Sequence, residues 1–151
     1  MKRFRFPLRP VAILRAHHEM RAREAFAASV HAFVKSEQEL AAAQARVRQF
    51  ELELTERRPN RFSPADQARA LTAYRQECTA EVEARQAMAA AQHAMQERRA
   101  EYVEAHRKLE VVRRLEEKAR NAYRYETARE EQAEFDDFAA RRFIRRTLES
   151  A

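Results

Sequence analysis

The chain contains no glycine among its 151 residues, and this absence limits how often the backbone can turn. Turns use glycine wherever the dihedral angle φ must be positive, so a globular domain of this length normally needs it at several positions. The chain has only four prolines and is rich in Ala, Arg, Glu, Gln and Leu, which are strong helix formers. With charged residues at 36%, this composition is typical of a coiled coil or another long helix.

The prolines divide the chain into helical stretches. Pro7 and Pro10 lie near the start, and Pro59 and Pro64 lie close together in the middle. Because proline lacks an amide hydrogen and clashes with the preceding helical turn, helices end beside it. The predicted order is an N-terminal segment, a first helix, a turn, a second helix and a tail, at residues 1–10, 11–58, 59–63, 64–146 and 147–151.

The start of the second helix has the clearest local signal. Ser63 suits the N-cap, Pro64 suits the first helical position, and Asp66 lies in the first turn. A connection this short between two long helices forces them to run in opposite directions. The sequence therefore predicts an all-α fold, a long two-helix antiparallel coiled-coil hairpin.

Apolar residues recur along both helices with the 4-3 spacing of a coiled coil. In the first helix the predicted inner face consists of Phe26, Val30, Phe33, Leu40, Val47 and Leu54, with Glu37, Gln44 and Glu51 as polar members. In the second helix it consists of Leu71, Tyr74, Cys78, Val82, Met88, Met95, Tyr102, Leu109, Val112 and Leu115. The spacing slips between Leu109 and Leu115, which predicts a stutter. Such a face serves a hairpin, a dimer or a partner-bound stalk equally well, so the oligomeric state stays open.

The net charge of +6 and the pI near 10.0 raise the question of whether the chain binds nucleic acid. Acidic residues alternate with basic ones along both helices, which favours a solvated surface of mixed sign. Basic clusters occur only at the two ends, as Lys2, Arg3, Arg5 and Arg9, and as Arg141, Arg142, Arg145 and Arg146. No nucleic acid is expected as a partner. A structural or nucleic-acid-binding coiled coil that self-associates is the alternative to the function given below.

The residue pattern predicts no enzyme, no cofactor and no metal site. The lack of glycine excludes a phosphate-binding P-loop, a dinucleotide fingerprint and a G-x-S-x-G motif. The five histidines are scattered, and the single cysteine, Cys78, excludes an internal disulfide. No apolar run approaches the length that a transmembrane helix needs, and the first residues do not form a secretory signal. We therefore expect a soluble cytoplasmic protein.

Both ends of the chain resemble the flagellar export protein FliJ family. Residues 4–11, Phe-Arg-Phe-Pro-Leu-Arg-Pro-Val, are similar to the F-x-F-x-L segment with which that family opens. Residues 129–139, Arg-Glu-Glu-Gln-Ala-Glu-Phe-Asp-Asp-Phe-Ala, are similar to its closing E-Q-x-x-x-D-E pattern, with Asp137 where Glu is commoner. The length and the two-helix layout also agree. A homologue from a virulence-type secretion system remains open.

The resemblance implies a non-catalytic component of the flagellar type III export apparatus. It implies binding to the export ATPase ring as a central stalk, a link to the membrane export gate protein, contacts with export chaperones, and a cytoplasmic location at the inner membrane. The residues it implies for the ring are Phe4, Phe6 and Leu8 at one end and Phe135, Asp137, Phe138, Arg141 and Arg142 at the other. Leu71, Tyr74 and Cys78, near the central turn, are the implied gate contacts.

Overall fold

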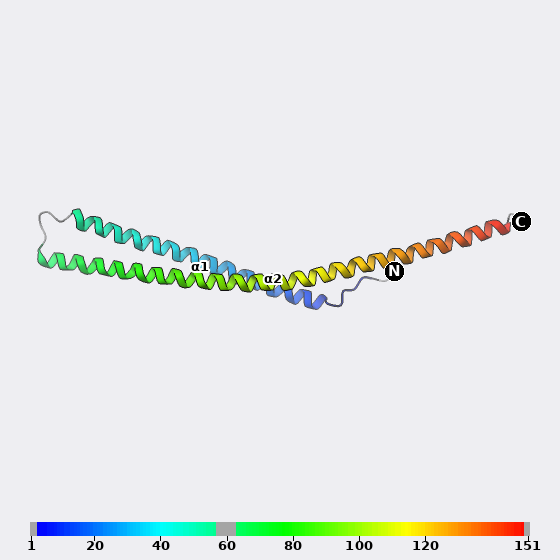
Figure 1. Cartoon of the computed structure of the whole chain (residues 1–151), viewed down its shortest axis with the longest axis horizontal. Helices are drawn as coiled ribbons and strands as arrows, with labels where there is room; N and C mark the ends of the chain where they lie inside the picture. The colour runs from blue at the N-terminus through cyan, green and yellow to red at the C-terminus, as the bar shows by residue number, and fades with distance from the viewer. Residues whose placement is uncertain (1–2, 57–62, 150–151) are drawn as a thin grey trace. The chain divides into compact units, whose positions relative to one another are not determined.

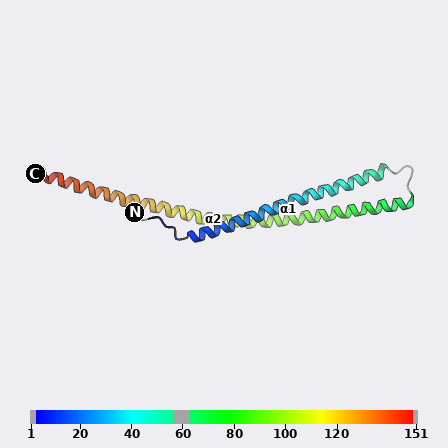
Figure 2. The same cartoon turned by 180° about the vertical axis from the view of Figure 1, so that it is seen from behind.

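The computed structural model describes residues 3–56 and 63–149, and its elements are two helices. Helix α1 comprises Arg9–Glu56 and helix α2 comprises Pro64–Glu149. In Figures 1 and 2 most of α1 lies beside the first part of α2, with the two helices running in opposite directions. The predicted all-α, two-helix antiparallel hairpin is confirmed. Of the predicted turn, only Ser63 lies within the described residues.

The two helices together build two compact units. Unit 1 combines Met1–His18 with His106–Ala151, and unit 2 is Glu19–Ala105. Each unit therefore pairs a stretch of α1 with a stretch of α2. Unit 2 holds the hairpin proper, and unit 1 holds both ends of the chain.

Two helix boundaries differ from the predicted ones: α1 begins two residues earlier, and α2 ends three residues later. Helix α1 begins at Arg9 because Pro10 fits the first helical turn, where a missing amide hydrogen leaves no bond unmade. Helix α2 begins at Pro64 as predicted, and the amides of Asp66 and Gln67 donate to the Ser63 carbonyl at 3.0 and 3.1 Å. It continues to Glu149 because no helix breaker follows Arg146.

The inner face of α1 contains two serines that the sequence pattern did not predict. Ser29 and Ser36, together with Ala43 and Phe50, alternate on it with Phe26, Phe33, Leu40, Val47 and Leu54. The predicted polar members Glu37 and Glu51 are instead exposed. A carboxylate on this face would lose its hydration. The Ser29 and Ser36 hydroxyls avoid that cost because they donate to the carbonyls of Phe26 and Phe33, at 2.6 and 2.7 Å.

The inner face of α2 keeps the 4-3 spacing through the region where a stutter was predicted. Leu109 and Val112 are both buried, whereas Leu115 is exposed. The prediction was wrong because it counted Leu115 as an inner residue. Glu116 holds that position instead, half-buried and paired with Arg120 at 3.0 Å. The inner face then continues to Ala119 and Tyr123 without interruption.

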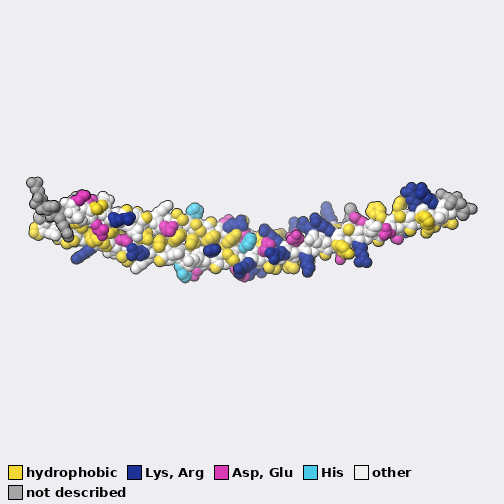
Figure 3. All heavy atoms as spheres, turned by 45° about the horizontal axis from the view of Figure 1, so that its top comes forward, with side chains coloured by type: hydrophobic (Ala, Val, Ile, Leu, Met, Phe, Trp, Pro, Cys, Tyr) yellow, Lys and Arg dark blue, Asp and Glu magenta, His cyan; other side chains and the backbone are white. Residues whose placement is uncertain are grey.

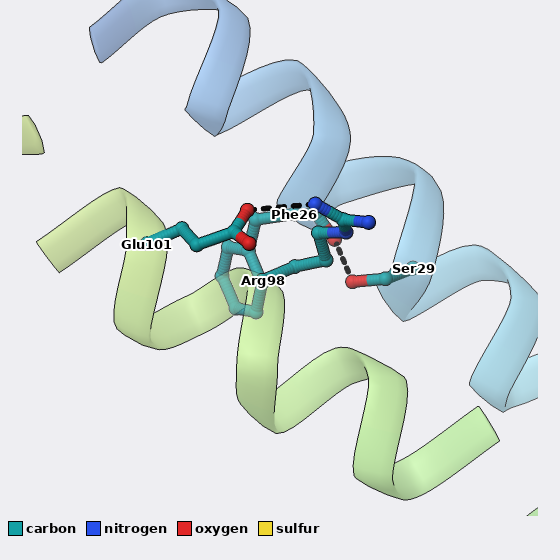
Figure 4. A network of polar contacts seen from close by, with 4 residues as sticks. All are labelled: Phe26, Ser29, Arg98 and Glu101. Carbon is teal, nitrogen blue, oxygen red and sulfur yellow. Dashed lines mark hydrogen bonds and ion pairs between the residues drawn. The ribbon is translucent and has the colours of Figure 1, made fainter. Parts of the chain in front are cut away.

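Aromatic and polar contacts join the two helices in unit 2. The rings of Phe26 and Tyr102 stack with centroids 6.1 Å apart, and Arg46 Nε pairs with Glu77 Oε2 at 3.0 Å. In Figure 4 the Arg98–Glu101 ion pair of α2 lies beside Phe26 and Ser29 of α1. Aromatic pairs of this kind contribute about 0.5–1.5 kcal/mol beyond the area they bury.

Ala43, only 1% exposed, marks a tightly packed point of the seam, where a larger side chain does not fit. We expect Ala43→Leu to destabilise the hairpin by about 1–3 kcal/mol, because overpacking pushes the helices apart. Its control is Ala42→Leu, on the exposed neighbouring residue, which should change stability by less than about 0.5 kcal/mol. Thermal unfolding followed by circular dichroism measures both. Equal melting temperatures for the two variants would contradict this packing.

Candidate partner-binding surfaces

The aromatic residues of the N-terminal segment pack within unit 1. The Phe4 ring lies 5.5 Å from the Tyr123 ring, and the Arg120 guanidinium lies 5.6 Å from the Phe4 centroid. Phe6 is buried, whereas Leu8 is exposed. Of the three residues predicted here for ring binding, Phe4 and Phe6 thus have an internal packing role. Leu8 is the one most open to a partner.

Leu71, Tyr74 and Cys78 share one side of α2, because residues three and four apart are neighbours on a helix. We call these three residues the 71–78 face. Leu71 is exposed, and Tyr74 and Cys78 are half-buried. Cys78 is a free thiol. The structure therefore brings together the three residues predicted to contact the gate protein; that contact stays a prediction.

Tyr74 also links the two helices near the central turn. Its hydroxyl donates to Glu51 Oε1 of α1 at 2.8 Å. This hydrogen bond, together with one to Cys78, raises the pKa of Tyr74 above its ordinary value of 10.0. The folded state thus favours the protonated phenol. The hydrogen bond of the Tyr74 hydroxyl contributes fully to stability below pH 10. This contribution is lost as the pH rises through the folded-state pKa of Tyr74.

The last part of α2, residues 128–148, has no buried side chain, and we call it the tail segment. Each of its residues is exposed, including the predicted Phe135, Asp137, Phe138, Arg141 and Arg142. The reason lies in the pairing within unit 1, where Phe4, near the start of the chain, lies against Tyr123. Figure 3 shows hydrophobic side chains beside a basic cluster near this end.

The predicted residues of the tail segment fall on two sides of the helix. At 100° per residue, Phe135, Phe138 and Arg142 lie within about 60° of one another. Asp137 and Arg141 point to the other side. An aromatic face with an arginine at its centre is the composition that interface hot spots favour. Phe143 is also exposed beside this face, and the predicted set omitted it.

A further exposed apolar patch, in unit 1, was missed. Val11 and Leu14 of α1 and Val111 and Leu115 of α2 are all exposed. In an antiparallel pair these positions flank the seam on the same side of both helices. Leu115 was predicted to lie on the inner face, and the signal for the other three was that they are large apolar residues just outside the 4-3 spacing. We call these four residues the unit 1 patch.

Metal and membrane features are absent from the described ranges, 3–56 and 63–149. No group of three or more His, Cys, Asp or Glu residues there could hold a metal ion. Neither described helix contains an apolar stretch that could cross a membrane.

The fold and these surfaces define a helical-hairpin coiled-coil protein that presents side chains from the outside of its helices. The family model described as flagellar FliJ protein matches residues 4–148. The chain therefore belongs to the FliJ family, a coiled-coil family of the flagellar export apparatus. No curated protein and no solved structure matches the chain.

The hydrogen bond from Tyr74 to Glu51 can be tested by titration. We expect Glu51→Gln to move the deprotonation of one of the four tyrosines to lower pH, because the neutral amide no longer favours the protonated phenol. The near-ultraviolet absorbance of phenolate reports this deprotonation. Glu37→Gln, on an exposed residue of the same helix, is the control and should leave the curve unchanged. Superimposable curves for Glu51→Gln and the unaltered chain would refute the link.

Proposed function

We propose that this chain is the stalk of the flagellar export ATPase, with the tail segment and the N-terminal segment bound inside the ATPase ring. Membership of the FliJ family over residues 4–148 supports a place in the export apparatus. The observation that carries the finer assignment is the continuous exposure of the tail segment. A helix of this length, about 30 Å, with every side uncovered, suits insertion into a ring that contacts it all round.

The chemistry of the tail segment fits a protein partner. Phe135 and Phe138 offer large apolar surface, and Arg142 between them can form charge-assisted hydrogen bonds with carboxylates. Arginine and aromatic residues dominate hot spots at protein interfaces. Attraction between the arginines and acidic groups of the ring should weaken as salt screens it.

The region near the central turn is the proposed contact for the membrane export gate protein. Leu71 is exposed there, and Tyr74 is held in place by its hydrogen bond to Glu51. A fixed side chain loses less conformational entropy on binding than a free one. In this arrangement the protein acts without catalysis, in the cytoplasm at the inner membrane, where it also contacts export chaperones.

Substitution of the aromatic face should weaken ATPase binding. For the pair Phe135→Ser and Phe138→Ser we expect a loss of affinity on the order of a thousandfold, since hot-spot residues are worth about 2 kcal/mol each and about 1.4 kcal/mol is tenfold. Ile144→Ser with Leu148→Ser is the matched control, because those exposed apolar residues lie on another side of the helix. A pull-down against the export ATPase, with its hydrolysis rate at low and moderate salt, measures the effect. If the unaltered chain neither binds nor changes the rate, the stalk assignment is wrong.

A change on the 71–78 face should act on the gate alone. We expect Leu71→Ser to weaken binding to the gate protein several-fold, because it removes exposed apolar surface without touching the seam. Binding to the ATPase and the melting temperature should stay unchanged. Val82→Ser, an exposed apolar residue farther along α2, is the control. Equal gate affinity for both variants would exclude this face.

A further inference from the structure

The tail segment is divided into an acidic half and a basic half. Residues 129–137 contain five carboxylates and one arginine, which gives a net charge of −4. Residues 141–148 contain four arginines and no carboxylate, which gives +4. Ala139 and Ala140 separate the two halves. The opposite charges thus cancel over the segment as a whole but not locally.

The large apolar side chains follow the same symmetry. Phe135 and Phe143 stand four residues before and four residues after Ala139, and Phe138 lies beside it. These rings are 70%, 69% and 65% exposed. Reversing the direction of the segment about Ala139 therefore places Phe135 level with Phe143 of the other copy, and the acidic half level with the basic half. The tail segment is therefore complementary to a second copy of itself that runs in the opposite direction.

We propose that the tail segment binds the tail segment of a second copy of this chain, antiparallel, with the two-fold axis near Ala139. Such an interface is isologous, so each contact occurs twice. Phe135 then lies level with the partner's Phe143, and the acidic residues 129–137 lie along the partner's arginines. The small side chains of Ala139 and Ala140 allow the two helices to approach at the axis. A parallel pair would place acid on acid and base on base, which is repulsive.

The division of charge also favours a second copy of this chain over other binding partners of the tail segment. A nucleic acid or an anionic membrane would attract the basic half and repel the acidic half in equal measure. Helix α1 does not cover this segment, because every residue of 128–148 is exposed. A complementary partner needs an acidic half and a basic half in the reverse order, and a second copy supplies both.

The area available predicts a weak dimer. Phenylalanine buries about 150–250 Å² when covered, so the four rings of Phe135 and Phe143 in the two copies supply on the order of 800 Å². This is near the lower bound for a specific interface. We expect a dissociation constant on the order of 10 μM that rises with salt, since the charge pairs stay near water. Because the face is the one assigned above to the ATPase, the ring and the second copy would compete for it.

The first experiment measures self-association of the full chain by sedimentation equilibrium. We expect a monomer–dimer equilibrium in the tens of micromolar that weakens at about 0.5 M salt. One variant carries Glu131→Arg and Asp136→Arg, and the other carries Arg142→Glu and Arg146→Glu, because these four residues flank the Phe135–Phe143 side of the helix. Each should lose self-association at least tenfold, and an equimolar mixture of the two should form a heterodimer. A strictly monomeric unaltered chain, or dimers that persist in both variants, would overturn the proposal.

The second experiment tests the orientation by disulfide crosslinking in a Cys78→Ser background. In an antiparallel pair Ala139→Cys meets its own copy, whereas Ala128→Cys lies about 33 Å from its copy. A disulfide needs Cα atoms within about 7 Å, so only Ala139→Cys should crosslink. Equal crosslinking at both positions would indicate a parallel pair and overturn the proposal. Neither experiment contains the ATPase, so failure here leaves the proposed stalk function standing.

Discussion

The structure depends on one narrow seam between two helices. Each helix offers the other a single stripe of side chains, and the rest of its surface stays in water. Such a seam buries far less apolar area than a globular core, so close approach of the backbones is needed to gain packing energy. Ala43 and Ser36 are buried in it because small side chains permit that approach. The stacked rings of Phe26 and Tyr102 join the two helices at another position of the seam.

Polar residues in the seam are tolerated where they have partners. Glu19 is buried in unit 2, and its carboxylate accepts from Arg23 at 2.7 Å. A buried polar member of a coiled-coil seam costs stability but disfavours shifted registers, in which the charge would lose its partner. Ion pairs along the outside, such as Arg85 with Glu81, neutralise charge locally. They offset part of the basic excess of a chain whose pI is near 10.0.

The sequence was sufficient for the fold and insufficient for the detail of its surfaces. The lack of glycine and the capping residues at Ser63–Asp66 predicted two helices and the start of the second. The choice of inner residues was harder to predict. Alanine and serine contribute little to an apolar pattern but fill the seam, whereas Leu115 fits the pattern and is exposed. The tail residues Phe135 and Phe138 were identified from family resemblance. Their exposure depends on how far α1 pairs along α2, which periodicity alone does not show.

The uncovered tail segment has a consequence for its own backbone. An isolated helix of about 20 residues is only marginally stable in water, because its nucleation cost is repaid by few bonds. From Ala128 onward α2 has no neighbouring helix to stabilise it, so its helix–coil equilibrium rests on intrinsic propensity and local pairs such as Gln132 with Asp136. This stretch should therefore exchange its amide hydrogens much faster than the seam. A protein that binds the tail segment will stabilise a helix that is only marginally stable in the free chain. Part of that protein's selectivity will come from this stabilisation.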